Sequence, residues 1–170
     1  MEMRLKTCTI RNWRAGDAAQ LALYANNHNV WRMLRDAFPH PYTLNDARSF
    51  IRFANFGSPV THFALEVEGA AAGSIGLVLK TDVYRKTAEL GYWLGEPFWG
   101  RGIATEAVSA LTEYAFSTYD LVRIFAGVFE GNAASMRVLE KAGYTQEARL
   151  RKNAFKEGRI IDELIYARTL

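Results

Sequence analysis

Two glycines at a strand-to-helix junction are the residues of this chain best suited to bind an anion. Gly100 and Gly102 lie between a strand-like run, Lys86–Leu94, and apolar residues that recur with helical spacing from Ile103 onward. Glycine lets phosphate oxygens approach backbone N–H groups that the first turn of a helix leaves unpaired, and the helix dipole adds positive charge there. The sequence therefore predicts an anion-binding loop made of Gly100, Arg101, Gly102, Ile103, Ala104 and Thr105.

The spacing of this loop separates it from two common nucleotide-binding motifs. It is not the dinucleotide-binding motif G-x-G-x-x-G, because no third glycine follows at the required offset, and it is not a P-loop, because no Lys-Ser/Thr pair closes it. The simplest alternative is a tight β–α turn in which the glycines have only a conformational role. The loop resembles the acetyl-CoA pyrophosphate loop of the GNAT acetyltransferase superfamily, Q/R-x-x-G-x-G/A, with Gly102 and Ala104 in the last two positions. Trp99 replaces the usual Gln or Arg, as in the RimJ/RimL-like branch of ribosomal-protein-alanine N-acetyltransferases.

A second segment, Gly131–Tyr144, strengthens the resemblance, which extends from about Arg11 to Tyr166. It is similar to the family segment N-x-x-S/A followed by G-F/Y, where the Asn binds the pantetheine arm, so the resemblance implies that role for Asn132. The alternative is that Asn132 is only the N-cap of a helix, the commonest role of Asn at such a position. The resemblance also implies that the backbone at Trp93 and Leu94 holds the pantetheine and offers an N–H to the tetrahedral oxyanion.

The resemblance assigns the proton donor by position. Many GNAT enzymes carry a tyrosine seven residues after the Asn, but Leu139 stands there and cannot donate a proton. In the ribosomal-protein branch a serine three residues after the Asn takes this role, which implies Ser135 as the donor to the leaving sulfur.

A general base is required because a primary amine, with a pKa of about 10, must lose a proton before it attacks a thioester. Glu89 matches the glutamate of the histone-acetylating branch, and strand alternation places it on one face with Gly91 and Trp93. The base position of the serine-type branch is Ala154, which cannot serve. A solvated surface role for Glu89 stays open, and the alternative bases are a water chain, Asp162 and Glu163.

Composition narrows the class of protein. The chain has 170 residues, of which 49% are hydrophobic, the size of one domain covering 1–170. Its net charge of +3 is mild and scattered, which argues against a nucleic-acid binder, and no apolar stretch is long enough for a membrane span. The single cysteine, Cys8, suits a buried position and a cytoplasmic location, and the three histidines lack metal-ligand spacing, so we predict no metal.

The expected elements are a mixture of helices and strands along the chain. A strand at 4–13 precedes two helices, at 16–26 and from Thr43 to about 54, and the segment 27–42 between them is expected to be a loop with at most a short helical turn. Asp17 is expected to cap the first helix and Asp46 to complete a capping box in the second. Strands follow at 61–67, 72–79 and 86–94, then a helix at 102–118, a strand at 122–129, a helix at 133–142 ended by Gly143, and a terminal hairpin of 144–152 with 159–167. This order predicts an α+β fold with a single mixed, mostly antiparallel central sheet of about six to seven strands and about four helices, which is also the GNAT order.

These expectations converge on an acetyl-CoA-dependent N-acetyltransferase that transfers the acetyl group directly to a primary amine. The acceptor is a protein N-terminus or a small-molecule amine, such as a polyamine or an aminoglycoside. A homodimer is compatible with this reading. A non-catalytic acyl-CoA-binding or regulatory module of the same fold, and a structural subunit of a larger complex, are the rival functions.

Overall fold

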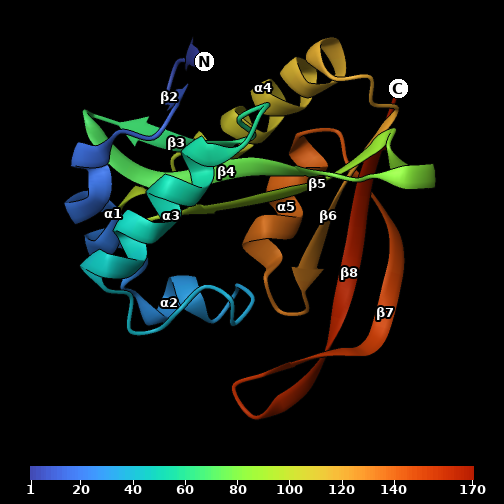
Figure 1. Ribbon diagram of the computed structural model, residues 1–170. Helices are drawn as coiled ribbons and strands as arrows, with labels where there is room; N and C mark the ends of the chain where they lie inside the picture. Colours follow the sequence, from blue (N-terminus) through green and yellow to red (C-terminus); the bar gives the residue numbers. More distant parts are fainter. The chain divides into compact units, whose positions relative to one another are not determined.

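The computed structural model describes residues 1–170, and its strands form one sheet of eight in the order β1-β2-β3-β4-β5-β6-β8-β7 (Figure 1). The strands are β1 (Glu2–Arg4), β2 (Thr9–Arg11), β3 (His62–Val67), β4 (Ala70–Leu79), β5 (Thr87–Leu94), β6 (Arg123–Phe129), β7 (Thr145–Lys156) and β8 (Arg159–Thr169). The helices are α1 (Ala18–Ala25), α2 (His28–Trp31), α3 (Leu44–Phe56), α4 (Ile103–Thr118) and α5 (Ala133–Lys141), with 3₁₀ turns η1 (Ala15–Asp17), η2 (Asp82–Tyr84) and η3 (Glu96–Phe98). The predicted α+β class is confirmed.

Pairing in the sheet is mostly antiparallel. The pairs β1–β2, β2–β3, β3–β4, β6–β8 and β7–β8 are antiparallel, whereas β5 and β6 run parallel in the register Thr87↔Arg123 to Glu89↔Phe125. A parallel pair needs a crossover connection, and α4 supplies it.

The chain divides into two compact units. The first contains Met1–Gly76 and Tyr92–Ala107, and the second contains Leu77–Gly91 and Val108–Leu170. The chain passes from one unit to the other within β4, within β5 and within α4.

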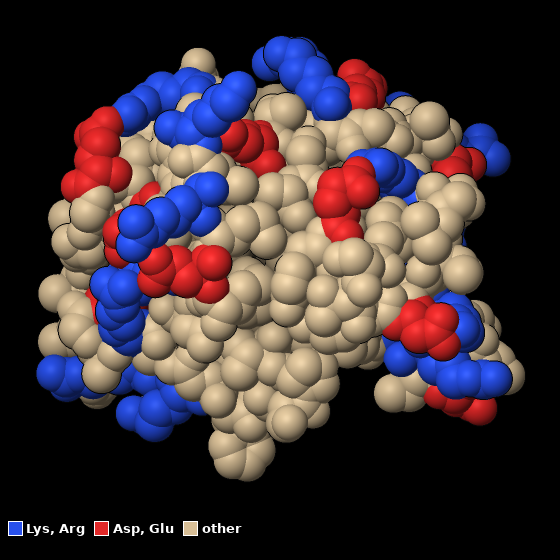
Figure 2. All heavy atoms as spheres, turned by 90° about the horizontal axis from the view of Figure 1, so that it is seen from above, with Lys and Arg blue, Asp and Glu red and all other residues tan.

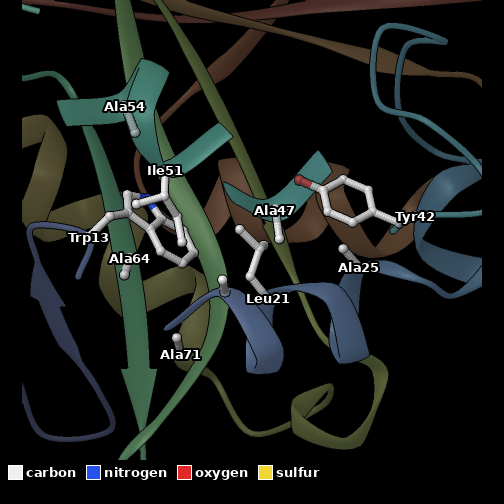
Figure 3. Close-up of a cluster of buried hydrophobic side chains, with 10 residues drawn as sticks. Trp13, Leu21, Ala25, Tyr42, Ala47, Ile51, Ala54, Ala64 and Ala71 are labelled. Carbon is white, nitrogen blue, oxygen red and sulfur yellow. The ribbon is translucent and has the colours of Figure 1, made fainter. Parts of the chain in front are cut away.

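The first unit has its own apolar core (Figure 3). Ala47, Ile51 and Ala54 recur along α3 and are buried together with Leu21 of α1 and Trp13. The predicted capping box of α3 is present, because the Thr43 hydroxyl accepts the Asp46 N–H at 3.2 Å while the Asp46 carboxylate accepts the Thr43 N–H at 2.7 Å.

The second unit is built around the β6–β8–β7 sheet and the helix α5. In β6, Ile124, Ala126 and Val128 are buried, as the predicted alternation requires. Gly143 has φ +85°, the left-handed conformation expected after a helix end. Tyr144, the next residue, is fully buried and its hydroxyl lies 2.7 Å from that of Thr112. Burial raises the pKa of this phenol to about 12, although the bond to Thr112 acts to lower it.

The N-terminal region differs from its prediction in two ways. The expected strand at 4–13 is two short strands, because the chain reverses and the Leu5 N–H donates to the Cys8 carbonyl at 2.8 Å. The Asp17 carboxylate does not cap α1. It accepts the Arg14 N–H and forms a two-pronged buried ion pair with the Arg11 guanidinium, with N–O distances of 2.8 and 2.9 Å.

The segment 27–42 is a loop with one short helical turn, as predicted: it contains the one-turn helix α2, whose N-cap Asn27 accepts the Asn29 N–H at 2.8 Å. The two strands of the terminal hairpin are longer than expected, at 145–156 and 159–169.

Cys8 is buried, as predicted. Burial, reinforced by the negative charge of Glu106, raises the pKa of its thiol to about 11. The thiol is therefore un-ionised at neutral pH and is not a nucleophile.

None of the helices combines the length and the apolar character needed to cross a lipid bilayer. On the face shown in Figure 2, basic and acidic side chains are interspersed.

Candidate active site

The end of β5 carries Trp93 and Leu94, the predicted pantetheine-binding residues, and a close backbone contact with β4 fixes it. A Cβ added to Gly73 of β4 would lie 2.3 Å from the Trp93 carbonyl oxygen and 2.9 Å from the Leu94 Cα. Only glycine permits this approach, because real Cβ atoms essentially never come within 3.0 Å of such neighbours. The backbone of β5 is thus held against β4 at the residues expected to contact the thioester.

The turn after β5 is closed by two hydrogen bonds. The Gly95 N–H donates to the Ala72 carbonyl at 2.7 Å, and the Trp99 indole N–H donates to the Leu94 carbonyl at 2.7 Å. Phe98, inside the same turn, is buried and meets the Tyr24 ring edge-on, with centroids 5.2 Å apart. Trp99, at the position that departs from the usual motif, therefore fastens the start of the glycine loop to the end of the strand.

The glycine loop has the backbone conformation that an anion site requires. Gly100 and Gly102 have φ values of +73° and +76°, and a Cβ added to either would meet no atom within 4 Å. Conformation, not crowding, demands glycine at both positions, and left-handed residues turn successive N–H groups into an anion-binding concavity. α4 begins directly afterwards at Ile103, and the Glu106 N–H donates to the Gly102 carbonyl at 3.1 Å. The loop fits a pyrophosphate by this geometry.

The charged side chains beside the loop have partners. Arg101 forms an ion pair with Glu68, and its guanidinium lies 5.9 Å from the Phe98 ring centre. Glu106, in the first turn of α4, accepts the Lys6 N–H at 3.0 Å, the Thr7 N–H at 2.8 Å and the Thr7 hydroxyl. Burial acts to raise the pKa of Glu106, but these hydrogen bonds outweigh it and hold the pKa below its usual value. Its charge is thus satisfied by the β1–β2 turn.

In the second unit, Asn132 and Ser135 lie together at the start of α5. The Asn132 side-chain oxygen accepts the Ser135 N–H at 3.2 Å, so Asn132 is the N-cap of this helix. Gly131 before it has φ +88° and lies in the turn that follows β6. The N-cap geometry occupies the amide oxygen of Asn132 and directs the start of α5. Leu139, at the position of the usual tyrosine, is fully buried.

Glu89, the predicted base, is held by an ion pair in the paired part of β5. Its carboxylate lies 2.7 Å from the Lys80 ammonium, with 23% and 31% of the two side chains exposed. The same ammonium lies 5.3 Å from the centre of the Phe125 ring, on the residue of β6 that pairs with Glu89. Lys80 therefore fixes the direction of the carboxylate.

The alternative bases, Asp162 and Glu163, both accept hydrogen bonds from neighbouring residues. Asp162 accepts the Lys152 N–H at 2.8 Å and the Arg149 Nε–H at 2.5 Å, and these bonds hold the pKa of its carboxyl below the usual value. Glu163 accepts from the Asn153 amide at 2.7 Å and lies over Gly127, where an added Cβ would meet its carboxylate oxygen at 2.2 Å. The hydrogen bonds of Asp162 thus lower the basicity of its carboxylate.

The predicted residues fall into two groups. Trp93, Leu94 and the loop 100–105 belong to the first unit, and Glu89, Asn132 and Ser135 belong to the second. Sequence reasoning missed Gly73, Lys80 and Glu106. The signal for Gly73 was a glycine inside a strand pattern, which often marks close backbone approach, and Glu106 was visible as an acidic residue in a first helical turn. Lys80 gave no signal, because its pairing with Glu89 depends on the fold of the β4–β5 hairpin.

No group of three or more His, Cys, Asp or Glu side chains in the structure is arranged to hold a metal ion.

Comparison with known proteins identifies the family. The family described as "Acetyltransferase (GNAT) domain" matches residues 8–145. The uncharacterized N-acetyltransferase p20 of Bacillus licheniformis is 30% identical over 172 residues, which cover 94% of this chain and 90% of that protein. The probable N-acetyltransferase YjcK of Bacillus subtilis is 52% identical over 68 residues, 40% of this chain, and the match spans 38% of that protein.

A solved structure agrees with the fold. RimL, described as a ribosomal L7/L12 alpha-N-protein acetyltransferase in complex with coenzyme A, superposes with a TM-score of 0.88 over 100% of this chain and 98% of its own, at 20% identity. The chain belongs to the GNAT acetyltransferase family, and its class is that of the acyltransferases.

Proposed function

We propose that this protein binds acetyl-CoA and transfers its acetyl group directly to a primary amine. The observation that carries the proposal is the pair of left-handed glycines, Gly100 and Gly102, that opens α4. Backbone N–H groups in this conformation suit the cosubstrate's pyrophosphate, and the match to GNAT enzymes supplies the thioester chemistry. In this assignment the pyrophosphate contacts the N–H groups of Gly100–Thr105, and the pantetheine arm contacts the backbone at Trp93 and Leu94 and the amide of Asn132.

The proposed reaction has one covalent exchange. The unprotonated amine attacks the thioester carbonyl, a C–N bond forms and the C–S bond breaks. An N–H at Trp93–Leu94 stabilises the oxyanion, as preorganised donors do in acyl transfer. Glu89, acting through an ordered water, takes the proton that the amine loses. Ser135 donates to the departing sulfur, because a thiolate with a conjugate-acid pKa of about 8.5 leaves more readily when it is hydrogen-bonded or protonated.

A protein N-terminus is the favoured acceptor. This choice rests on the RimJ/RimL-like form of the glycine loop, with Trp99 in place of Gln or Arg, and on the fold shared with RimL. A small amine, such as a polyamine or an aminoglycoside, is the alternative acceptor, and its site would need no protein-docking surface.

The test is thiol release from acetyl-CoA across a panel of amines. The panel contains peptides with free N-termini, the same peptides with blocked N-termini and a free lysine, a polyamine and an aminoglycoside. We expect turnover on at least one free N-terminus and none on its blocked counterpart. Binding of acetyl-CoA without turnover on any amine would instead support the rival function, a non-catalytic acyl-CoA-binding module.

A further inference from the structure

Strand pairing within the second unit brings Lys80, Glu89 and Phe125 together. Lys80 directly follows β4, Glu89 lies in β5 and Phe125 lies in β6, and these strands are adjacent in the sheet (Figure 1). The Lys80 N–H donates to the Thr87 carbonyl at 3.0 Å, and strand alternation puts Thr87 and Glu89 on the same face. Phe125 is the partner of Glu89 in the β5–β6 register. The three side chains therefore share one face of the sheet.

The ammonium of Lys80 is held from two sides. It lies 2.7 Å from Oε2 of Glu89 and 5.3 Å from the centre of the Phe125 ring, within the range of a cation–π contact. A lysine side chain with a single contact keeps much of its rotational freedom, whereas contacts on two different strands restrict it. The ammonium is thus a fixed point against which the Glu89 carboxylate is set.

A second cation lies near the same ring but has a carboxylate of its own. The Arg123 guanidinium is 5.8 Å from the centre of the Phe125 ring. Its two terminal nitrogens donate to the two carboxylate oxygens of Glu147 at 2.7 and 2.6 Å, and these bonds raise the pKa of the guanidinium. Arg123 is therefore committed to Glu147, and it is the Lys80 ammonium that contacts Glu89.

Stability is a poor reason for the Lys80–Glu89 pair. Both side chains are partly exposed, and ion pairs of this kind contribute little to the free energy of unfolding. A carboxylate that acts through an ordered water has a strict geometric requirement, because the water must lie between the carboxylate and the amine. The glutamate side chain is flexible, and an oriented contact with a fixed ammonium restricts it to one direction.

We propose that Lys80 is a positioning residue for acetyl transfer, which sets the direction of the Glu89 carboxylate for receiving the proton of the amine through the water. The amine nitrogen gives up this proton as its bond to the acetyl carbon forms, and Lys80 neither gains nor loses a proton. The inference rests on the proposed function, in which Glu89 is the base. Its expected sign is opposite to that of a pure charge effect, because a nearby positive charge by itself makes a carboxylate a poorer proton acceptor.

The experiment is a double-mutant cycle in turnover on the full chain. Lys80→Met removes the ammonium and keeps an unbranched side chain, and Glu89→Gln removes the basic oxygen. Thiol release from acetyl-CoA gives kcat and KM for both variants, the double variant and the native protein, with an amine from the panel above that the native protein acetylates. Lys80→Arg is the conservative variant, and Lys80→Ala is a second way to remove the ammonium. Denaturant unfolding shows that each variant is folded.

Lys86→Met is the matched control. Lys86 immediately precedes β5 and forms an ion pair with Asp120 that is more exposed than the Lys80–Glu89 pair. The substitution removes the same chemical group from a nearby ion pair that does not involve Glu89. We expect this variant to keep the native kcat.

The expected result is a loss of rate that depends on Glu89. Lys80→Met and Lys80→Ala should each lower kcat about threefold to tenfold, the coupling usual between contacting residues, with KM for acetyl-CoA unchanged. Lys80→Arg should restore much of the native kcat, because it keeps a cation that can reach the carboxylate. In the Glu89→Gln background, Lys80→Met should cause no further loss. A purely structural role would lower the rate in either background.

Four results would overturn the role of Lys80. They are a native kcat in Lys80→Met, faster transfer in Lys80→Met, a loss that persists in the Glu89→Gln background, and an equal loss in Lys86→Met. Any of them, with amines still acetylated by the native protein, overturns this inference and leaves the proposed function standing. If the native protein acetylates no amine, the proposed function fails and the role of Lys80 fails with it.

Discussion

In the loop Trp99–Glu106 the groups offered to a ligand belong to the backbone, whereas in the segment Gly131–Ser135 they belong to side chains. The loop's geometry follows from two left-handed glycines, and no side chain has to be placed for its N–H groups to converge. At the start of α5 the Asn132 oxygen is committed to the Ser135 N–H, so the residue named for binding also has a local structural task.

The difference teaches how each region should respond to mutation. A site made of backbone groups is lost when a substitution prevents the required backbone conformation, so substitutions in the glycine loop should weaken acetyl-CoA binding. A site made of side chains is lost when one functional group is removed, so substitutions at the start of α5 should lower the rate of acetyl transfer. The following predictions test that division.

The largest effect is expected at Ser135. Ser135→Ala should lower kcat by about 10²- to 10⁴-fold, the usual contribution of a positioned proton donor, while acetyl-CoA affinity changes little. Ser135→Thr is the control, because it keeps the hydroxyl. Steady-state kinetics and calorimetry separate the two quantities. Equal losses in affinity and turnover would show that Ser135 acts in binding, and the two regions would then not differ in the way described above.

The second effect concerns the glycine loop. Gly102→Val places a β-branched residue at φ +76°, which costs on the order of 1–3 kcal/mol in strain and sets a side chain against the anion. Acetyl-CoA affinity measured by calorimetry should fall by about tenfold to a hundredfold. Gly16→Val is the matched control, since an added Cβ there meets no atom and φ is not in the left-handed range. Native acetyl-CoA affinity in a folded Gly102→Val protein would show that the glycine loop is not the anion-binding site.

A substitution at Gly73 tests the close contact between β4 and the end of β5. Gly73→Ala should destabilise the protein by about 1–3 kcal/mol, the usual cost of overpacking, because its Cβ meets the Trp93 carbonyl at 2.3 Å. Denaturant unfolding measures this, and acetyl-CoA affinity should fall with it. Gly91→Ala is the control in β5, where an added Cβ meets nothing within 4 Å. Equal stability of the two variants would show that β4 and β5 adjust freely.

The smallest effect is expected at Glu89. Glu89→Gln keeps the shape of the side chain and removes its basicity, so transfer at neutral pH should slow several-fold. The deficit should shrink as pH rises, because more of the amine is then already unprotonated. A Glu89→Gln enzyme with native rate and an unchanged pH profile would leave Asp162, Glu163 or bulk water as the base. It would also show that the Lys80 ion pair is structural.

Local chemistry made most of the fold predictable. The helix end at Gly143 and the capping box of Thr43 and Asp46 each depend on residues within a few positions of one another, and both are present. The reversal at residues 5–8 was missed because apolar alternation continues through it. Periodicity does not reveal where a strand is interrupted by a tight turn.

The site was predictable in proportion to how much of it is backbone. The left-handed positions could be predicted from the sequence, since glycine is the residue that such conformations favour. Contacts between segments that are distant in the sequence could not be predicted in this way. The hold of Lys6 and Thr7 on Glu106 joins residues 99 to 100 positions apart, and Gly73 meets Trp93 only after the strands have paired. Register between strands, rather than residue type, determines these contacts.

The burial of Cys8 has a practical consequence for measuring this enzyme. Cys8 is the only cysteine of the chain, and its raised pKa keeps it protonated at the pH of a thiol-release assay. The native protein therefore contributes no reactive sulfur of its own, and the colour developed by a thiol reagent reports coenzyme A alone. A single cysteine introduced on the surface, for example Asn153→Cys, would therefore be the only reactive thiol available for labelling.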